Sequence, residues 1–204
     1  MNIVTPRIGM DRFVDADWME IAAAVVRGDA TEQALRARLE NDIPGPQVQR
    51  KVIGILNRMW QPKETSLQEL AIEAANMATG GHAERVAAFE AVAVGTYPYF
   101  RQVAENLGRL LRLQGSCSAG EIHRRMFELH GKRSTIDQAT SYCFKTMVSW
   151  GMMGRTNDRR IIPAAQLTLD IHARRLLDRA ANLSRHSVSP LQPTDPLLFP
   201  FQQS

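Results

Sequence analysis

The chain has 204 residues, of which 44% are hydrophobic and 23% charged, a composition typical of a globular protein that buries a sizeable core. No apolar run approaches the roughly 18 residues of a membrane helix, and the start MNIVTPRIGMDRF lacks the regions of a signal peptide. Two cysteines provide neither a disulfide framework nor a paired metal-ligand spacing. These features predict a cytoplasmic protein and exclude a disulfide-stapled or membrane-spanning one.

Charge is distributed unevenly along the chain. Residues 1–100 hold 10 Lys and Arg against 13 Asp and Glu, a balance of −3. Residues 101–160 hold 11 against 5, a balance of +6, and residues 161–204 hold 4 against 3. An acidic half followed by a basic segment is the pattern expected of a polyanion-binding module joined to a second domain.

The first half predicts a small helical bundle. Helical spacing of apolar residues, capping residues and Gly or Pro breaks predict helices over residues 18–26, 30–40, 48–59, 66–78, 82–94 and 99–113. Asp17 is the expected cap of the first helix. Thr65 or Ser66, each followed three residues later by Gln or Glu, is expected to open the fourth with a capping box.

The order of elements changes after residue 107. A short extended segment around Cys117 precedes a helix that begins with a capping box at Ser118 and ends at Gly131, and a second helix follows over 134–150. Two short strand candidates then flank an Asn-Asp turn, with three arginines at or beside its tip. Over residues 99–163 this order resembles a winged helix-turn-helix, in which the second helix fits the DNA major groove and the hairpin reaches the backbone or minor groove.

Three short runs carry a more particular resemblance. Residues 97–100 (YPYF), 108–115 (GRLLRLQG) and 149–153 (SWGMM) are similar to sequences in the BrxA-like accessory proteins of bacterial BREX phage-defence systems. The resemblance implies a helical N-terminal domain, a C-terminal winged helix and DNA binding. Residues 1–96 contain no run that shares this resemblance.

The end of the chain predicts a helix and a tail. An amphipathic helix is expected over 166–183, followed by a segment rich in Ser and Pro. Its apolar residues Leu197, Leu198, Phe199 and Phe201 indicate either packing onto the chain's own surface or a short docking motif for a partner. The predicted fold is therefore mainly all-α, with an N-terminal helical domain (1–95), a winged helix-turn-helix domain with a C-terminal helix (96–183) and a Pro/Ser-rich tail (184–204).

Motifs for catalysis are missing from the sequence. It contains no phosphate-binding loop, dinucleotide fingerprint, HExxH zinc motif or GxSxG elbow. His123 and His130 share a helix face but lack a third ligand, so we expect solvated surface histidines. Cys117 and Cys143 fall at core-facing positions. We expect no cofactor, no metal and no enzymatic activity.

The second helix of the basic segment has two distinct faces. Its inward face is expected to hold Ile136, Ala139, Cys143, Met147 and Trp150. Glutamine pairs with adenine, Ser and Thr reach bases or phosphates, and Lys and Arg neutralise phosphates. The predicted DNA contacts are Lys132, Arg133, Ser134, Thr135, Gln138, Ser141, Tyr142, Lys145, Arg155, Arg159 and Arg160. A solvated polar face explains the same residues if no DNA binds.

The leading hypothesis is a non-enzymatic double-stranded DNA-binding protein, an accessory or regulatory factor of a phage-defence system. Its acidic helical domain, or its tail, would form a homodimer or bind protein partners rather than nucleic acid. The alternative is a protein-protein adaptor that uses the winged helix as a docking surface. Arginines paired with carboxylates of the first half would favour the adaptor, and an open positive face would favour DNA. RNA is a third option, for which only Tyr142 is well placed to stack.

Overall fold

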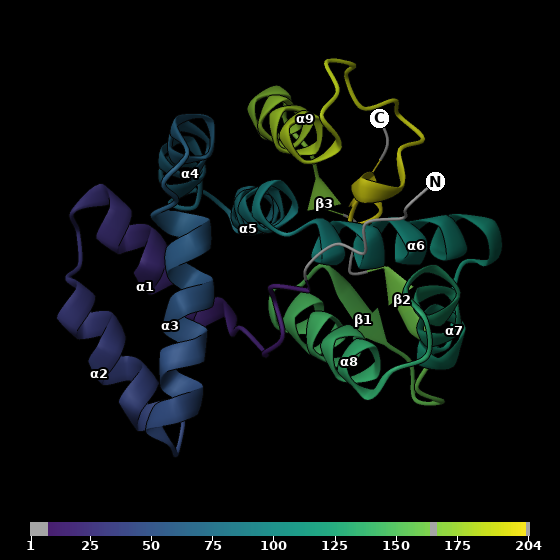
Figure 1. Ribbon diagram of the computed structural model, residues 1–204. Helices are drawn as coiled ribbons and strands as arrows, with labels where there is room; N and C mark the ends of the chain where they lie inside the picture. The colour runs from purple at the N-terminus through teal and green to yellow at the C-terminus, as the bar shows by residue number, and fades with distance from the viewer. Residues whose placement is uncertain (1–7, 164–166, 203–204) are drawn as a thin grey trace.

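The structure is a computed structural model that describes residues 8–163 and 167–202 of the chain. These residues are mainly helical, with two small two-stranded sheets (Figure 1), which confirms the predicted class. The α-helices are α1 (Ala16–Arg27), α2 (Glu32–Asp42), α3 (Pro46–Trp60), α4 (Thr65–Met77), α5 (His82–Thr96), α6 (Pro98–Gln114), α7 (Ala119–His130), α8 (Ser134–Ser149) and α9 (Ile171–Arg185). The short elements are β1 (Met153–Arg155), β2 (Ile161–Pro163), β3 (Leu167–Thr168), the 3-10 helix η1 (Pro196–Leu198) and β4 (Phe201–Gln202).

Two helix starts in the first half differ from the expected caps. The side chain of Asp15, not Asp17, caps α1 and accepts a hydrogen bond from the backbone N–H of Asp17. Helix α4 begins after Glu64 without any side-chain cap, so the predicted capping box at Thr65 or Ser66 is wrong. The Ser66 hydroxyl instead donates to the Glu64 carboxylate, a local contact that competes with capping.

The centre of the fold is α5, which packs against α4 and α9 and also contacts α6 and α3 (Figure 1). Residues 86–94 of α5 are all buried. Buried residues from both halves of the chain form one continuous hydrophobic cluster. Glu90 of α5 is also fully buried, and its carboxyl has no hydrogen-bond partner among the described residues.

The second half places a β-hairpin beside two helices. Strands β1 and β2 are antiparallel, and Cys117 extends the pairing, because its N–H and C=O exchange hydrogen bonds of 3.0 and 2.7 Å with Ile161. Helix α7 begins with the predicted capping box between Ser118 and Glu121. Gly131 ends α7 and α8 follows.

The C-terminal part differs from the expected single helix. Helix α9 begins at Ile171, after its cap Asp170, rather than near residue 166, and Gln166 itself lies outside the described residues. Leu167 belongs instead to β3, which pairs in parallel with β4. A short strand pairing between segments more than thirty residues apart leaves no local pattern that would separate it from a helix start.

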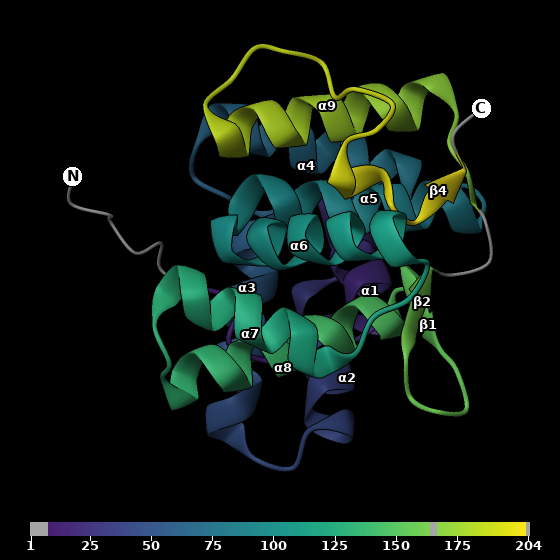
Figure 2. The ribbon, with the colours of Figure 1, turned by 90° about the vertical axis from the view of Figure 1, so that its right-hand side faces the viewer.

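The segment after α9 returns across α6 (Figure 2). Leu191, Leu197, Leu198 and Phe201 are buried, which confirms packing of the apolar residues onto the chain's own surface. The contact is close at Gly108, where a Cβ would collide with the Pro196 carbonyl oxygen. Residues 203–204 of the predicted tail lie outside the described residues.

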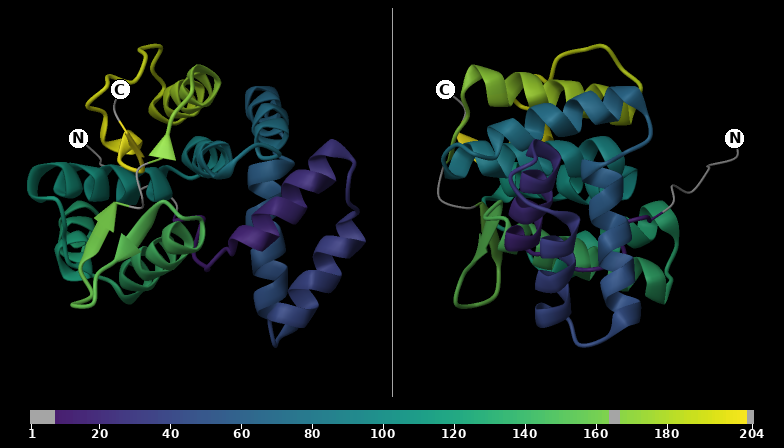
Figure 3. Two further views of the ribbon diagram at one scale, coloured as in Figure 1. Left: turned by 180° about the vertical axis from the view of Figure 1, so that it is seen from behind. Right: turned by 90° about the vertical axis from the view of Figure 1, so that its left-hand side faces the viewer.

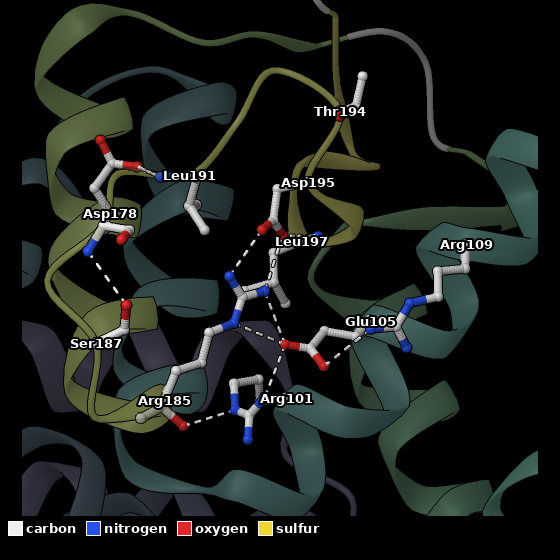
Figure 4. Close-up of polar contacts among 12 residues, drawn as sticks. Arg101, Glu105, Arg109, Asp178, Arg185, Ser187, Leu191, Thr194, Asp195 and Leu197 are labelled. Carbon is white, nitrogen blue, oxygen red and sulfur yellow. Dashed lines mark hydrogen bonds and ion pairs between the residues drawn. The ribbon is translucent and has the colours of Figure 1, made fainter.

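A charged cluster, here called the latch, ties this segment to α6 and α9 (Figure 4). It consists of Arg101, Glu105, Arg109, Arg185 and Asp195. Glu105 Oε1 accepts from Arg101 Nη1 and from Arg185 Nη2, each at 2.8 Å. Arg185 Nη1 in turn donates to Asp195 Oδ2 at 2.8 Å. The hydrogen bonds that Arg185 donates to Asp195, and then to Glu105, raise the pKa of Arg185.

Candidate nucleic-acid interface

Helix α8 is fixed to the protein core along its inner face. The residues predicted to point inward, Ile136, Ala139, Cys143, Met147 and Trp150, are all buried. The Tyr99 hydroxyl of α6 lies 2.8 Å from Thr140 Oγ1. At the end of α8, the Trp150 ring packs against Phe89 and Phe100, with centroid distances of 5.8 and 5.6 Å. The helix therefore has one fixed position relative to α5 and α6.

An N-terminal arm, residues 8–15, runs along one side of α8. The Val14 N–H donates to Thr146 Oγ1 at 3.0 Å, and Trp150 Nε1 donates to the Val14 carbonyl at 3.1 Å. The Ala16 N–H, at the start of α1, donates to Ser149 Oγ at 2.9 Å. These contacts join α8 to the first half of the chain.

The outer face of α8 is polar. Ser134, Thr135, Gln138 and Lys145 are exposed, whereas Ser141 and Tyr142 are half-buried. Tyr142 lies under two cations, because the Arg12 guanidinium and Lys145 Nζ each stand 5.8 Å from its ring centroid. A ring that cations already cover is a poor platform for base stacking, which disfavours the RNA option.

The turn and the hairpin place their cations differently. Lys132, Arg155 and Arg159 are exposed, and Arg133 is exposed while donating to the His130 carbonyl at 2.8 Å. Arg159 has a φ of 64°, in the left-handed region that Gly or Asn occupies at lower cost. Its N–H donates to the Thr156 carbonyl at 2.9 Å, which closes the hairpin loop. The loop thus holds the Arg159 side chain toward solvent.

Arg160 lies at the end of the hairpin loop, where the loop joins β2, and not at its tip. Its Nε donates to Ser116 Oγ at 2.8 Å and its Nη2 to the Ser116 carbonyl at 3.0 Å. Half-buried and engaged in this way, Arg160 joins the hairpin to the segment before α7. The contact spans 44 residues of sequence, so the spacing of the arginines does not reveal it.

The cations on α7, α8 and the hairpin form no ion pair with any carboxylate that the structure describes. Of the eight Lys and Arg between residues 119 and 163, no member takes part in an ion pair within the described residues. They are Arg124, Arg125, Lys132, Arg133, Lys145, Arg155, Arg159 and Arg160. Without Arg125, which lines a hollow beside Glu105 and Arg109 of the latch, we call this set the unpaired face.

Three of the four carboxylates of the same region have other partners. Hydrogen bonds from the Ser118 backbone, and then from Gln114, lower the pKa of Glu121 to about 2. Asp137 lies 2.8 Å from His123 Nδ1, and a hydrogen bond from Thr156 lowers the pKa of Asp158. These three acids are therefore held by a cap, a histidine or a turn, and the exposed Glu128 of α7 forms no ion pair among the described residues.

Sequence reasoning missed a second set of cations, on α3. Arg50, Lys51 and Arg58 line a groove of about 680 Å³ together with the N-terminal arm and with Thr135 and Gln138 of α8. Residues 46–60 contain these three cations and no acid. That signal is visible in the sequence, but the net charge of −3 over residues 1–100 conceals it.

One predicted surface residue is in fact buried. His130 packs against Tyr99 with ring centroids 5.3 Å apart, and its Nε2 lies 2.7 Å from Gln102 Oε1. Burial lowers the pKa of His130, so the expectation of a solvated histidine is wrong there. Both cysteines are buried as predicted, and burial raises the pKa of Cys117 to about 11 and of Cys143 to about 12.

Over residues 8–163 and 167–202, no cluster of three or more His, Cys, Asp or Glu is arranged to hold a metal ion. No helix in the same residues has the length and apolarity needed to cross a membrane. No protein-family model, curated protein or solved structure significantly matches the chain. A functional assignment therefore rests on the geometry and charge described above.

Proposed function

We propose that the protein is a non-enzymatic double-stranded DNA-binding protein. In this proposal α8 enters the major groove and the loop between β1 and β2 contacts the sugar-phosphate backbone. The observation that carries the proposal is the unpaired face. Cations gathered without carboxylates repel one another, and a polyanion that binds across them relieves this repulsion and releases its own counterions.

The shape of the region supports the same function. The hairpin loop, α8 and the turn between α2 and α3 lie on one side of the molecule in every view (Figure 1, Figure 2, Figure 3). An exposed helix face of this kind fits the major groove, which is about 12 Å wide. Gln138 on that face is the candidate for contact with a base, while Arg155 and Arg159 are the candidates for phosphates.

Within this proposal, α6, Cys117, α7, α8 and the β1–β2 hairpin act as a winged helix-turn-helix. The resemblance to BrxA-like accessory proteins then suggests an accessory or regulatory role in a bacterial phage-defence system. The adaptor hypothesis loses its expected support, because the turn and hairpin arginines do not pair with carboxylates of the first half within the described residues.

Strain at Arg159 also favours a contact outside the chain. A left-handed backbone costs a non-glycine residue about 1 kcal/mol, and such strain tends to persist where function requires the side chain. Arg159 pairs with no carboxylate in the described residues. A contact between the Arg159 guanidinium and a DNA phosphate would explain why this residue is held in a strained conformation.

Fluorescence anisotropy with a labelled duplex, titrated at several salt concentrations, tests the proposal. The double variant Arg155→Gln/Arg159→Gln is compared with Arg36→Gln/Arg175→Gln, which removes the same charge from two exposed arginines elsewhere. We expect the hairpin variant to bind about tenfold more weakly and to flatten the salt slope by about 2. The control variant should bind like the wild type.

Two results would contradict the proposal. Wild-type protein that binds no duplex even at low salt would exclude DNA as the ligand and favour a protein partner. If the hairpin variant and the control variant lose the same amount of duplex affinity, net charge, and not the unpaired face, governs binding.

A further inference from the structure

One exposed side of α3 faces the start of α8. Gln47, Arg50, Lys51, Gly54 and Arg58 follow each other at helical spacing and line the groove between α3, the N-terminal arm and α8. We call these five residues the α3 stripe. The other side of α3 is buried through Val52, Leu56 and Met59, so the orientation of the stripe is determined by the core.

The stripe is positively charged in an otherwise acidic half. Arg50, Lys51 and Arg58 take part in no ion pair among the described residues. The single carboxylate that lines the groove in the described residues is Asp11, which pairs with Arg12 at 3.4 Å. The rest of residues 1–100 holds 7 Lys and Arg against 13 acids. The stripe is therefore a positive region within an acidic half, and its charge has the same sign as that of the unpaired face.

The groove connects the stripe to the helix that the proposed function places in DNA. Thr135 and Gln138, on the first two turns of α8, line the same groove as Arg50 and Lys51. In Figure 1 the α2–α3 end and the hairpin loop lie on opposite sides of α8. A major groove is bordered by two phosphate backbones, so a helix inserted between them needs cations on both sides.

We infer that α3 is a second backbone-binding wall, in which Arg50 and Lys51 bind the phosphates on the side of α8 opposite the hairpin. This inference rests on the proposed function. It makes the N-terminal half part of the DNA interface, against the expectation drawn from its acidic net charge. The duplex would then contact α3 on one side, the β1–β2 hairpin on the other side, and α8 between them.

Gly54 provides a sharp test, because it lies in the middle of the stripe. A Cβ there meets only Arg58 Nη2, at 3.9 Å, so a side chain fits without a clash. Gly54→Glu places a carboxylate between the cations, and Gly54→Gln is the control of equal size. Both substitutions favour the helix relative to glycine. We expect Gly54→Glu to bind duplex DNA about threefold to tenfold more weakly than Gly54→Gln at low salt.

The outcomes separate this inference from the proposed function. Equal duplex affinities of Gly54→Glu and Gly54→Gln, combined with weaker binding by the hairpin variant, would overturn the role of α3 and leave the proposed function intact. Absence of duplex binding by the wild type would instead remove the proposed function itself. If Gly54→Glu binds duplex DNA more weakly than Gly54→Gln, and Arg50→Gln/Lys51→Gln also binds it more weakly than the wild type, the results support both the role of α3 and the proposed function.

Discussion

Arginines serve two different purposes in the latch and in the unpaired face. In the latch, Arg101, Arg109 and Arg185 surround Glu105, whose side chain is only 9% exposed, and Arg185 also binds Asp195 (Figure 4). On the unpaired face, the cations of α7, α8 and the hairpin have no carboxylate within the described residues. Both regions are rich in arginine, and they differ in whether the arginines are paired.

The comparison indicates that pairing with a carboxylate, more than the number of cations, distinguishes arginines that stabilise the fold from arginines that are available to a ligand. A nearly buried carboxylate with three arginines compensates its own desolvation and holds two segments together. Unpaired surface cations contribute nothing comparable to folding. The two regions should therefore respond in opposite ways to substitution.

The largest effect is expected from Glu105→Gln in the latch. The change leaves Arg101 and Arg185 facing a neutral amide, and removing one partner from a mostly buried ion pair costs about 3 kcal/mol. Chemical denaturation should show this loss of stability, whereas duplex affinity of the folded protein should not change. Glu40→Gln, an exposed acid on α2, is the matched control. A latch variant as stable as this control would remove the distinction between the two regions.

Glu90 is the converse case, a carboxyl without any cation. Burial, and then the nearby charge of Asp195, raises its pKa well above the ordinary value of 4.5. The charged form is therefore costly in the folded state, and this cost is absent below the unfolded pKa and grows as the pH rises above it. We expect Glu90→Met to stabilise the protein by about 1–3 kcal/mol at pH 7.

The pH dependence gives a second check on Glu90. The stability difference between Glu90→Met and the wild type should shrink as the pH falls from 7 toward 4.5. Thermal unfolding of both proteins at a series of pH values measures this stability difference. A difference that does not vary with pH would show that Glu90 keeps the same protonation in both states.

Local patterns in the sequence predicted the local features of α7 and α8 correctly, although they misplaced the caps of α1 and α4. The Ser118–Glu121 capping box, the end of α7 at Gly131 and the buried face of α8 all follow from spacing within one or two turns. The face of α8 that holds the candidate contacts was predictable for the same reason. Such features need no knowledge of the rest of the fold.

Features that depend on distant contacts were not predictable. The hydrogen bond between Val14 and Thr146 spans 132 residues, and the pairing of β3 with β4 and the burial of His130 also require the folded chain. The same holds for the groove between α3 and α8. The cations of α3 escaped notice for a related reason, because an average over 100 residues conceals one helix of opposite charge.

Lysine labelling in the presence of duplex DNA tests the central claim most directly, because the chain has four lysines in informative places. Lys132 and Lys145 belong to the unpaired face, Lys51 to the α3 stripe, and Lys63 follows α3 on the surface; all four are exposed. We predict that saturating duplex slows acetylation of Lys132, Lys145 and Lys51, and leaves Lys63 unchanged. Equal protection of all four lysines, or protection of Lys63 alone, would contradict the account.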